Sequence, residues 1–406
     1  MTPPASAHRG QQAVFGLIHL ALAAPMIYLA LGLPLLMRQH GWSGVEIGLF
    51  QLAGLPALLK ALMAMPVERP GQQGHGARHY RRWTAALGAG YAAALLLLAL
   101  AGIHAPKPVL FALLLACVLC ATWADVPVSA LAIRVLPPAE RARAGGVRSA
   151  ALFAAAILGG GLMLVLAQRL GWASPFLVMA ALLGLALAWL PTLHGQGDAA
   201  APVAPPLPAA ADPALLRGFF RQPGMGRWLV LLTACFPFVG VAWVYLKPML
   251  LDQGLRAEPV AWALGMGGGT LGAAASLAVA RRLGHERLAA WLPLSAWGNG
   301  AVLGLLALAL WLRAPAPWLI AGGLALAVSV GVCSSIVFGR MMDFTRPGRQ
   351  ALDYGIQASF FALGRLALMP VAGWLLDRAG SASLMLALCV PALCVAALAW
   401  RWRHRP

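Results

Sequence analysis

The sequence predicts an all-α polytopic membrane protein, with twelve transmembrane helices in two pseudo-symmetric bundles of six. Three observations predict this fold class: the composition, the number of apolar runs, and an Ala/Pro-rich segment that divides the runs equally. Of the 406 residues, 61% are hydrophobic and only 10% are charged. Soluble domains are about half apolar and about a quarter charged. The composition therefore excludes an ordinary soluble enzyme.

The predicted N-terminal bundle covers residues 14–194, after a cytoplasmic tail of residues 1–13. A transmembrane helix needs about 20 mostly apolar residues. The first apolar run is too long for a signal-peptide core, and no small-residue cleavage pattern follows it. We therefore interpret this run as an uncleaved first span. The six predicted spans are 14–37, 45–66, 83–103, 109–133, 145–167 and 175–193.

The longest polar stretch, residues 195–227, is predicted to be a cytoplasmic linker between the halves. Its core is rich in Ala and Pro and almost uncharged, which favours a flexible tether. The C-terminal bundle is predicted over residues 228–400, and residues 401–406 form a basic cytoplasmic tail. Its six spans are 228–250, 259–280, 289–312, 318–339, 352–374 and 383–400.

The net charge of +18 indicates topology and not a nucleic-acid partner. Nucleic-acid binding needs a clustered basic face, whereas these basic residues stand in twos and threes between apolar runs. Assigning each one to the nearest helix end places 21 of the 30 on the side of the N-terminus. Such an excess marks the cytoplasmic side. We therefore expect a multi-pass protein of the bacterial inner membrane with both termini in the cytoplasm.

The two halves repeat each other weakly at an offset of 209 residues. Residues 166–174 match residues 375–383 at Leu, Arg, Gly, Ala and Ser. The basic turn that ends at Arg81 and Arg82 has a counterpart at Arg281 and Arg282. Parallel repeats of this kind are typical of transporters, which bind their substrate between the halves near the membrane midplane.

Two charges inside predicted spans are candidates for proton coupling. Lys60 and Asp125 each lie nine residues before an Arg that marks the cytoplasmic end of its helix, Arg69 and Arg134 respectively. Both therefore lie about 13 Å from that face. Charges inside spans are functional candidates by default. Asp125 would carry the proton and Lys60 would set its pKa. Alternatively, the pair is purely structural, or Lys60 extends to the interface and never meets Asp125.

Arg365 is the main candidate for substrate binding. It lies near the middle of its span, 16 residues after Arg349 and 13 before Arg378. Because a guanidinium facing lipid at that depth is costly, we expect it to face a central cavity. There it would hold a carboxylate or another anionic group by a two-pronged contact. The structural alternative is pairing with a helix carbonyl or a neighbouring acid.

Four more polar residues are candidates for the substrate site: Tyr28, Arg148, Asp353 and Gln357. Asp353 and Gln357 stand one helical turn apart and would share a face. Gln357 follows Arg148 by 209 residues, so the two occupy equivalent positions in the halves. Arg148 also lies close enough to a span end to extend to the interface, and Tyr28 has packing as its alternative role.

The sequence holds no pattern for covalent chemistry. It has no buried Ser/His/Asp set, no His/Cys metal spacing and no phosphate-binding loop. The six cysteines all fall inside predicted spans, which argues against disulfides. We therefore expect no enzyme activity, no catalytic residue, no metal site and no cofactor.

Twelve spans split six and six, with basic turns after the second and eighth, resemble the major facilitator superfamily. The turn after the second span contains Glu68 and Arg69, followed by Arg81 and Arg82 after a long Gly/Gln/His loop. The usual motif of the family has Asp where this chain has Glu68. The resemblance implies a major facilitator fold, with these four residues as a cytoplasmic gate motif. Fold alone says little about cargo.

Several stretches resemble one branch of that superfamily, the peptidoglycan-fragment permeases of the AmpG type and the related RhtX/FptX siderophore permeases. The pattern Asp353-x-x-x-Gln357 favours the siderophore side. The chain departs from the branch at Ser129, which replaces an Asp, and at Arg148, which replaces a Gln. The stretches are residues 33–69, 121–134, 159–172 and 342–374.

This resemblance implies a proton-driven importer that moves a ferric siderophore from periplasm to cytoplasm by alternating access. The expected partners are an anionic metal chelate or another polar mid-sized solute, protons and the lipid bilayer, with the protein acting as a monomer. Three alternatives stay open: import of peptidoglycan fragments, export of drugs or siderophore, and a membrane scaffold or sensor without transport.

Overall fold

The computed structural model describes residues 5–42, 46, 50, 52–68, 76–194 and 213–403. Within these residues the chain is helical and contains no strand. Ten helices are long and apolar enough to cross a membrane. One of them, α17 (Gln350–Trp402), is two helices joined at Gly380, and a shorter apolar helix spans Leu52–Val67. The described residues thus contain twelve apolar helices, which confirms the predicted fold class.

Contacts divide the chain into two compact units, and each unit takes one segment from the other half of the sequence. Unit 1 comprises residues 1–137, 154–215 and 345–359. Unit 2 comprises residues 138–153, 216–344 and 360–406. The two exchanged segments, 138–153 and 345–359, begin the fifth and eleventh spans, which correspond to each other in the sequence repeat.

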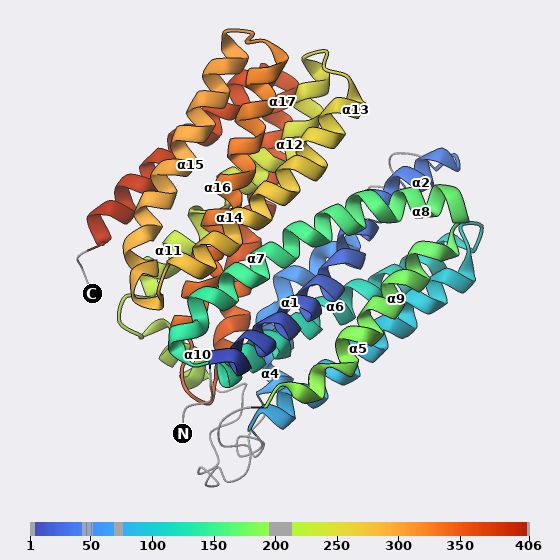
Figure 1. The fold of residues 1–406 in the computed structure, drawn as a ribbon, viewed down its shortest axis with the longest axis vertical. Helices are drawn as coiled ribbons and strands as arrows, with labels where there is room; N and C mark the ends of the chain where they lie inside the picture. The colour runs from blue at the N-terminus through green and yellow to red at the C-terminus, as the bar shows by residue number, and fades with distance from the viewer. Residues whose placement is uncertain are drawn as a thin grey trace. The chain divides into compact units, whose positions relative to one another are not determined.

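Unit 1 is built around α5, which packs on both α6 and α9 (Figure 1). Gly88 and Gly90 permit these approaches, because a side chain at Gly88 would collide with Leu187 and one at Gly90 would touch Cys120. The helices of unit 1 are α1 (Ala5–Ile27), η1 (Tyr28–Gly32), α2 (Leu33–Gln39), η2 (Leu52–Leu59), α4 (Lys60–Val67), α5 (Gly76–Ala101), α6 (Lys107–Val135), η5 (Leu158–Leu162), α8 (Met163–Leu170), α9 (Ala173–Ala188) and η6 (Leu190–Thr192), with the last residues of α7 (Arg141–Ile157) and the start of α17.

Unit 2 has its core where α16 packs against α14, α15 and α12. Leu246, Leu264, Leu303 and Leu326 are fully buried there. The helices of unit 2 are the first part of α7, α10 (Pro213–Phe220), α11 (Met225–Ala234), α12 (Pro237–Asp252), α13 (Ala257–Val260), η7 (Ala261–Gly268), α14 (Gly269–Arg282), α15 (Leu288–Trp311), α16 (Ala316–Asp343) and most of α17, together with the short turns η4 (Pro138–Glu140) and η8 (His285–Arg287).

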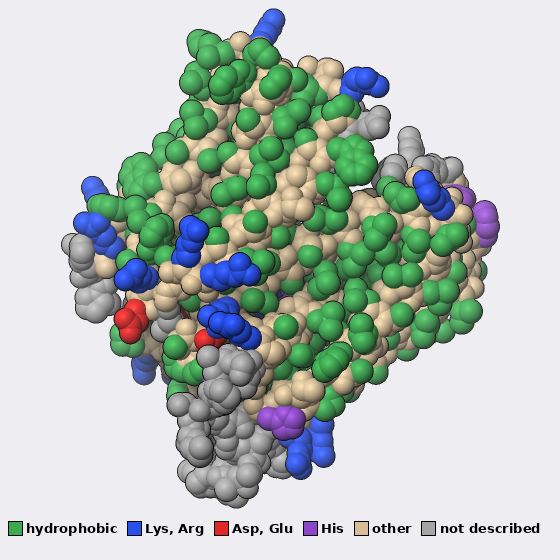
Figure 2. Space-filling model, in the orientation of Figure 1, with side chains coloured by type: hydrophobic (Ala, Val, Ile, Leu, Met, Phe, Trp, Pro, Cys, Tyr) green, Lys and Arg blue, Asp and Glu red, His purple; other side chains and the backbone are tan. Residues whose placement is uncertain are grey.

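The helix flanks carry a large exposed apolar surface. Leu100, Leu305 and Trp311 are each more than 60% exposed, and Figure 2 shows hydrophobic side chains spread over the visible flanks of the helices. Exposed apolar patches of this extent mark contact with a membrane or a partner. Together with the span lengths, they identify a multi-pass membrane protein.

The structure refines three sequence expectations. The first helix begins at Ala5, ahead of the predicted span start at residue 14. The second span is a tight 3₁₀ segment followed by a short α-helix, with the junction at Lys60. The predicted linker contains helix α10, while residues 195–212 lie outside the described part of the chain.

Candidate functional site

Lys60, Asp125 and His19 meet inside unit 1. Lys60 Nζ donates to Asp125 Oδ2 at 2.6 Å, and His19 Nδ1 lies 3.8 Å from Asp125 Oδ1. All three side chains are largely buried, with 17%, 14% and 6% exposed for Lys60, Asp125 and His19 respectively. A carboxylate held between an amine and an imidazole can gain and lose a proton while its neighbours balance the charge.

The position of Lys60 follows from a change of helix type. The residue begins α4, where the 3₁₀ helix η2 ends. Such a change inside a span frees backbone groups and is common at functional hinges. Here the N–H of Ala61 donates to Ser359 Oγ at 3.0 Å, and a side chain at Gly355 would collide with the Lys60 carbonyl. The first turns of α17 therefore pack directly beside the buried lysine.

Arg365 lies in the part of α17 that belongs to unit 2, and its side chain is accessible. Trp374, which is 57% exposed, is nine residues away and thus roughly 180° round the helix. Ala358 and Ala372, on the same face as Arg365, are buried at 6% and 2%. The arginine therefore points away from the exposed apolar flank of its helix, towards the packed side.

No side chain that the structure describes lies within hydrogen-bond or ion-pair distance of Arg365. Its neighbour Gly364 approaches the backbone so closely that a side chain would meet the Thr233 carbonyl at 2.2 Å. That carbonyl belongs to the end of α11, just before the break that Pro237 imposes between α11 and α12. An accessible guanidinium beside a broken helix is suited to binding an anion.

Asn299 and Ser329 reinforce this helix break. The Asn299 side-chain amide donates to the Cys235 carbonyl at 3.1 Å, and Ser329 Oγ donates to Asn299 Oδ1 at 2.6 Å. These bonds satisfy polar groups that water cannot reach. They hold α15 and α16 against the break and so fix the surroundings of Gly364.

Arg148 does not extend to the interface. Its side chain is only 7% exposed, and its guanidinium carbon lies 4.7 Å from the centre of the Phe338 ring. This cation–π contact ties α7 to α16 within unit 2. The adjoining Ser149 shares hydrogen bonds with Ser276 and Ser334, at 2.8 and 2.5 Å. Arg148 thus sits in a closely packed helix interface.

Asp353, Gln357 and Tyr28 are fully buried in unit 1. Asp353 accepts from Arg346 through the backbone N–H, Nε and an NH2 group at 2.9, 2.8 and 2.6 Å. Gln357 Nε2 donates to the Asp353 carbonyl at 3.2 Å. Tyr28 packs edge-on against Phe176 with ring centres 5.6 Å apart. In this conformation none of the three is open to a solute.

Glu68 caps the beginning of α17. Tyr80 Oη and the N–H of Ala351 both donate to Glu68 Oε1, at 2.6 and 2.8 Å. Burial raises the pKa of the Glu68 carboxyl to about 7, although these hydrogen bonds and the nearby Arg349 act in the opposite direction. A carboxylate at a helix N-terminus also interacts favourably with the helix dipole.

The other described members of the predicted gate motif, Arg81 and Arg82, do not share the contacts of Glu68. Arg81 donates to the Pro191 and Leu193 carbonyls at 3.3 and 2.9 Å, and so caps the end of α9 and η6. Arg82 is exposed. Arg69 lies outside the described residues.

The structure brings some candidates together and leaves others in separate groups. In unit 1, Lys60 joins Asp125, and Asp353 joins Gln357, whereas Arg148 and Arg365 belong to unit 2. Among the described residues, no group of three or more His, Cys, Asp or Glu side chains is placed to hold a metal ion.

The candidates named from the sequence did not include His19. The available signal was an ionisable residue inside the first span, the same signal that singled out Asp125. Sequence position alone did not show that α1 turns this residue towards α6. Glu68 was identified, but its acceptance of the Ala351 N–H, 283 positions along the chain, required the folded structure.

Comparison with known proteins gives one family and several structural neighbours. The sequence model of the Major Facilitator Superfamily matches residues 14–298. The human organic anion transporter MFSD10 (TETRAN) has a TM-score of 0.73 at 20% identity, covering 98% of this chain and 100% of its own.

Two bacterial neighbours have similar scores. A bacterial homologue of the iron transporter ferroportin, in an outward-facing state with soaked iron, has a TM-score of 0.73 at 16% identity, covering 97% of this chain and 99% of its own. The Escherichia coli fucose:proton symporter FucP has a TM-score of 0.72 at 16% identity, covering 98% and 99%. At these identities the likeness establishes the fold.

Proposed function

Because the chain belongs to the Major Facilitator Superfamily, a family of secondary active transporters, we propose that it imports a ferric siderophore across the bacterial inner membrane, from periplasm to cytoplasm. The proton-motive force drives the import by alternating access. The observation that carries the proposal is Arg365, an accessible guanidinium without a polar partner among the described residues, on the packed face of its helix.

Arg365 supports an anionic cargo. A guanidinium offers a planar fork of N–H donors that matches a carboxylate or a similar oxyanion. Placing a charge in a span is costly unless something compensates it. Arg346 and Lys60, which also lie close to or within spans, each have a carboxylate partner in the structure. For Arg365 we infer that the compensating charge arrives with the cargo.

The cluster of Lys60, Asp125 and His19 supports proton coupling. Protonation of Asp125 would remove the charge that holds Lys60 at 2.6 Å, and the released ammonium would need another partner. The contact of α4 with the start of α17, through Ser359 and Gly355, gives this change a route to the gate residue Glu68. We propose that protonation of Asp125 and opening of the Glu68–Ala351 contact are linked steps of transport.

The siderophore itself rests on the resemblance of the sequence to the siderophore permeases. The names of the organic anion transporter and the ferroportin homologue agree with an anionic, iron-linked cargo, but their likeness of 16–20% identity concerns the fold alone. Import of peptidoglycan fragments and export of drugs or siderophore use the same architecture, and a transport assay distinguishes them from siderophore import.

Uptake by proteoliposomes tests the proposal. Vesicles containing the purified protein are given a labelled ferric siderophore under an inward proton gradient. Loss of a bidentate charged contact costs about 1.5–3 kcal/mol, so we expect Arg365→Ala to reduce uptake at low substrate concentration by about tenfold or more. Arg365→Lys keeps the charge without the fork and should lie in between. Arg378→Ala removes the same charge near the end of the same helix segment and should transport normally.

The same assay separates proton coupling from binding. We expect Asp125→Asn to lose the response to the proton gradient while it still exchanges labelled for unlabelled siderophore. His19→Gln should shift the pH dependence of uptake. Full uptake by both Arg365→Ala and Asp125→Asn would refute the proposal. Transport of a muropeptide but not a siderophore, or accumulation only in inverted vesicles, would replace it by one of the two alternatives.

A further inference from the structure

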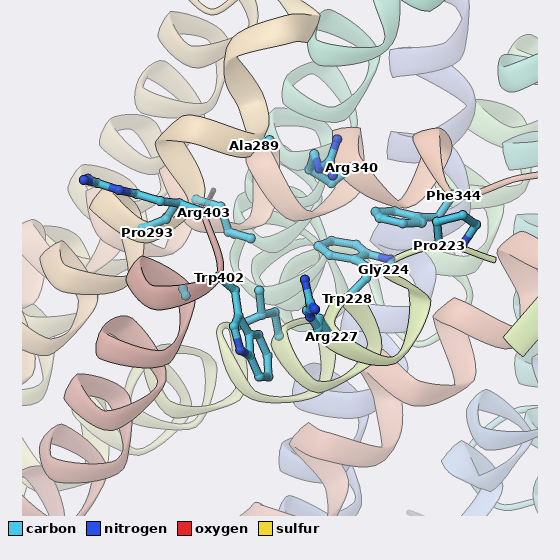
Figure 3. A pocket seen from close by; sticks show the side chains of 13 residues that line it. Pro223, Gly224, Arg227, Trp228, Ala289, Pro293, Arg340, Phe344, Trp402 and Arg403 are labelled. Carbon is cyan, nitrogen blue, oxygen red and sulfur yellow. The ribbon is translucent and has the colours of Figure 1, made fainter. Parts of the chain in front are cut away.

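Unit 2 contains a basic pocket that the transport proposal does not use. It lies where α11 and α15 begin and where α16 and α17 end (Figure 3). Its volume is about 210 Å³. Arg227, Arg340 and Arg403 line it, and no acidic residue in the described part of the chain does. Figure 3 shows the Trp228 ring between the Arg227 and Arg340 side chains.

Aromatic side chains contact Arg340 and Arg403. Trp228 and Phe344 stack with ring centres 5.2 Å apart and planes 7° from parallel. The Arg340 guanidinium carbon lies 5.1 Å from the Phe344 ring centre, and the Arg403 guanidinium carbon 3.8 Å from that of Trp400. Cation–π contacts of this kind orient a guanidinium without neutralising it.

Among the described residues that line the pocket, the charged side chains are all arginines. Arg340 donates to Asp343 at 2.9 Å, but Asp343 also accepts from Arg141 at 3.5 Å. One carboxylate therefore serves two arginines, while three arginines line the pocket. The pocket is suited to an anion.

Unit 1 has a second basic pocket, which shares two lining positions with the first through the sequence repeat. Its volume is about 370 Å³, and Arg78, Arg81, Arg82 and His194 line it, at the start of α5 and the end of α9. The repeat offset of 209 carries His194 onto Arg403, which lines the pocket of unit 2. The same offset carries Leu190 onto Ala399, and both of these residues line their pockets. The end of the last span of each half thus lines a basic pocket, although the arginines of the two pockets do not correspond in the repeat.

The surroundings of both pockets indicate a lipid and not a dissolved ion. On α15 the exposed apolar side chains Trp291, Leu294 and Trp297 start within one or two turns of the pocket of unit 2. Leu185 on α9 and Trp189, directly after it, are likewise about half exposed beside the pocket of unit 1. A phosphate held in either pocket would thus leave the attached acyl chains against an apolar flank. Basic pockets between membrane helices are suited to lipid headgroups.

We propose that each of the two basic pockets binds the headgroup phosphate of an anionic glycerophospholipid. Arg227, Arg340 and Arg403 bind it in unit 2, and Arg78, Arg82 and His194 bind it in unit 1. The lipids anchor the arginine-rich ends of the helices at the membrane surface, independently of the cargo.

Native mass spectrometry of the full-length protein tests this inference. The protein is released from micelles that contain equal amounts of phosphatidylglycerol and phosphatidylcholine, and retained lipids are counted. We expect two phosphatidylglycerol molecules on the wild type. The double variants Arg227→Gln/Arg403→Gln and Arg78→Gln/Arg82→Gln should each retain one, with the affinity of the altered pocket reduced about fivefold for each lost guanidinium.

Matched controls make the outcome decisive. Arg281→Gln removes a charge from the exposed end of α14, outside both pockets, and should retain two lipids. Arg227→Lys/Arg403→Lys keeps the charge and should also retain two. Equal retention of phosphatidylcholine would overturn the inference. So would competition by millimolar inorganic phosphate as effective as that by lipid, because the pockets would then be sites for the free ion.

Discussion

At the residue scale, Glu68 is a buried carboxyl just beyond the end of α4. It is 4% exposed, and its carboxyl accepts hydrogen bonds from Tyr80 and from the first turn of α17. Arg349, also buried at 3%, has two guanidinium nitrogens without a hydrogen-bond partner among the described residues. The ionised Glu68 therefore depends on helix and side-chain donors in place of water.

The raised pKa of Glu68 predicts a stability that falls as pH rises. Burial lifts this pKa from 4.5 to about 7, so the folded protein holds the proton more tightly than the unfolded chain. Below pH 4.5 both states are protonated. Between pH 4.5 and 7 the carboxyl is ionised in the unfolded state but still protonated in the folded state. The free energy of unfolding therefore falls by up to about 3 kcal/mol over this range. Above pH 7 the contribution is constant.

Thermal unfolding of Glu68→Gln in micelles measures this contribution. Gln accepts the same two hydrogen bonds without a charge. The stability of the variant should therefore not show the fall between pH 4.5 and 7 that Glu68 causes in the wild type. Glu286→Gln removes an exposed carboxylate and should keep the wild-type profile. Identical pH profiles for Glu68→Gln and the wild type would contradict the prediction.

At the element scale, the sequence repeat has a direct structural counterpart. Gly171 ends α8 with φ 85° and ψ 177°, and Gly380, 209 residues later, has φ 78° and ψ 177°. This combination of backbone angles is available almost only to glycine. The repeat is therefore not merely compositional, since it reproduces the same turn between the last two helices of each half.

At these two turns, any residue other than glycine is expected to strain the backbone. No neighbouring atom lies within 4 Å of a Cβ at Gly380, so Gly380→Ala acts through the backbone alone. We expect it to lower the free energy of unfolding by about 1–3 kcal/mol. Gly298→Ala, inside α15 with equal space around it, should be neutral or slightly stabilising. Equal unfolding midpoints for the two variants would show that the Gly380 turn is not strained by alanine.

The helices themselves were largely predictable, because apolar runs of membrane length have few alternative structures. The predicted spans and the observed helices differ where hydropathy and helix geometry differ. The first helix starts at Ala5, since a helix can continue beyond the apolar run that crosses the membrane. The second span contains a 3₁₀ segment with Pro56, which no hydrophobic pattern reveals.

At the scale of the whole molecule, the twelve helices do not divide at the linker alone. The first part of α7 belongs to unit 2 and the first part of α17 to unit 1, so each of these helices belongs to both units. Arg148 lies in one exchanged segment, and Asp353 and Gln357 lie in the other. Contacts such as Glu68 with Ala351 arise from this exchange, and local sequence patterns do not specify them.

The distribution of basic residues predicts the orientation of the whole molecule. Cysteines introduced as Ala105→Cys, between α5 and α6, and Ala199→Cys, in the central linker, can be probed with a membrane-impermeant maleimide in intact cells. We expect labelling at position 105 and none at position 199 until the membrane is opened, because 21 of the 30 basic residues lie on the linker side. The unaltered chain measures background labelling, and the reverse pattern would invert the proposed topology.

The sequence by itself determined the membrane class, the twelve spans and their repeat, because hydrophobic length and glycine backbone angles are local properties. It also singled out Lys60, Asp125 and Arg365, since a charge in an apolar run is visible without a fold. Only the tertiary structure decided which of these charges meet. Burial against neighbouring helices placed His19 and Lys60 beside Asp125, enclosed Asp353 with Arg346, and left Arg365 accessible. Those outcomes depend on the face that each helix turns towards its neighbours. Because nearly every face of these helices is apolar, the spacing of apolar residues does not determine that face.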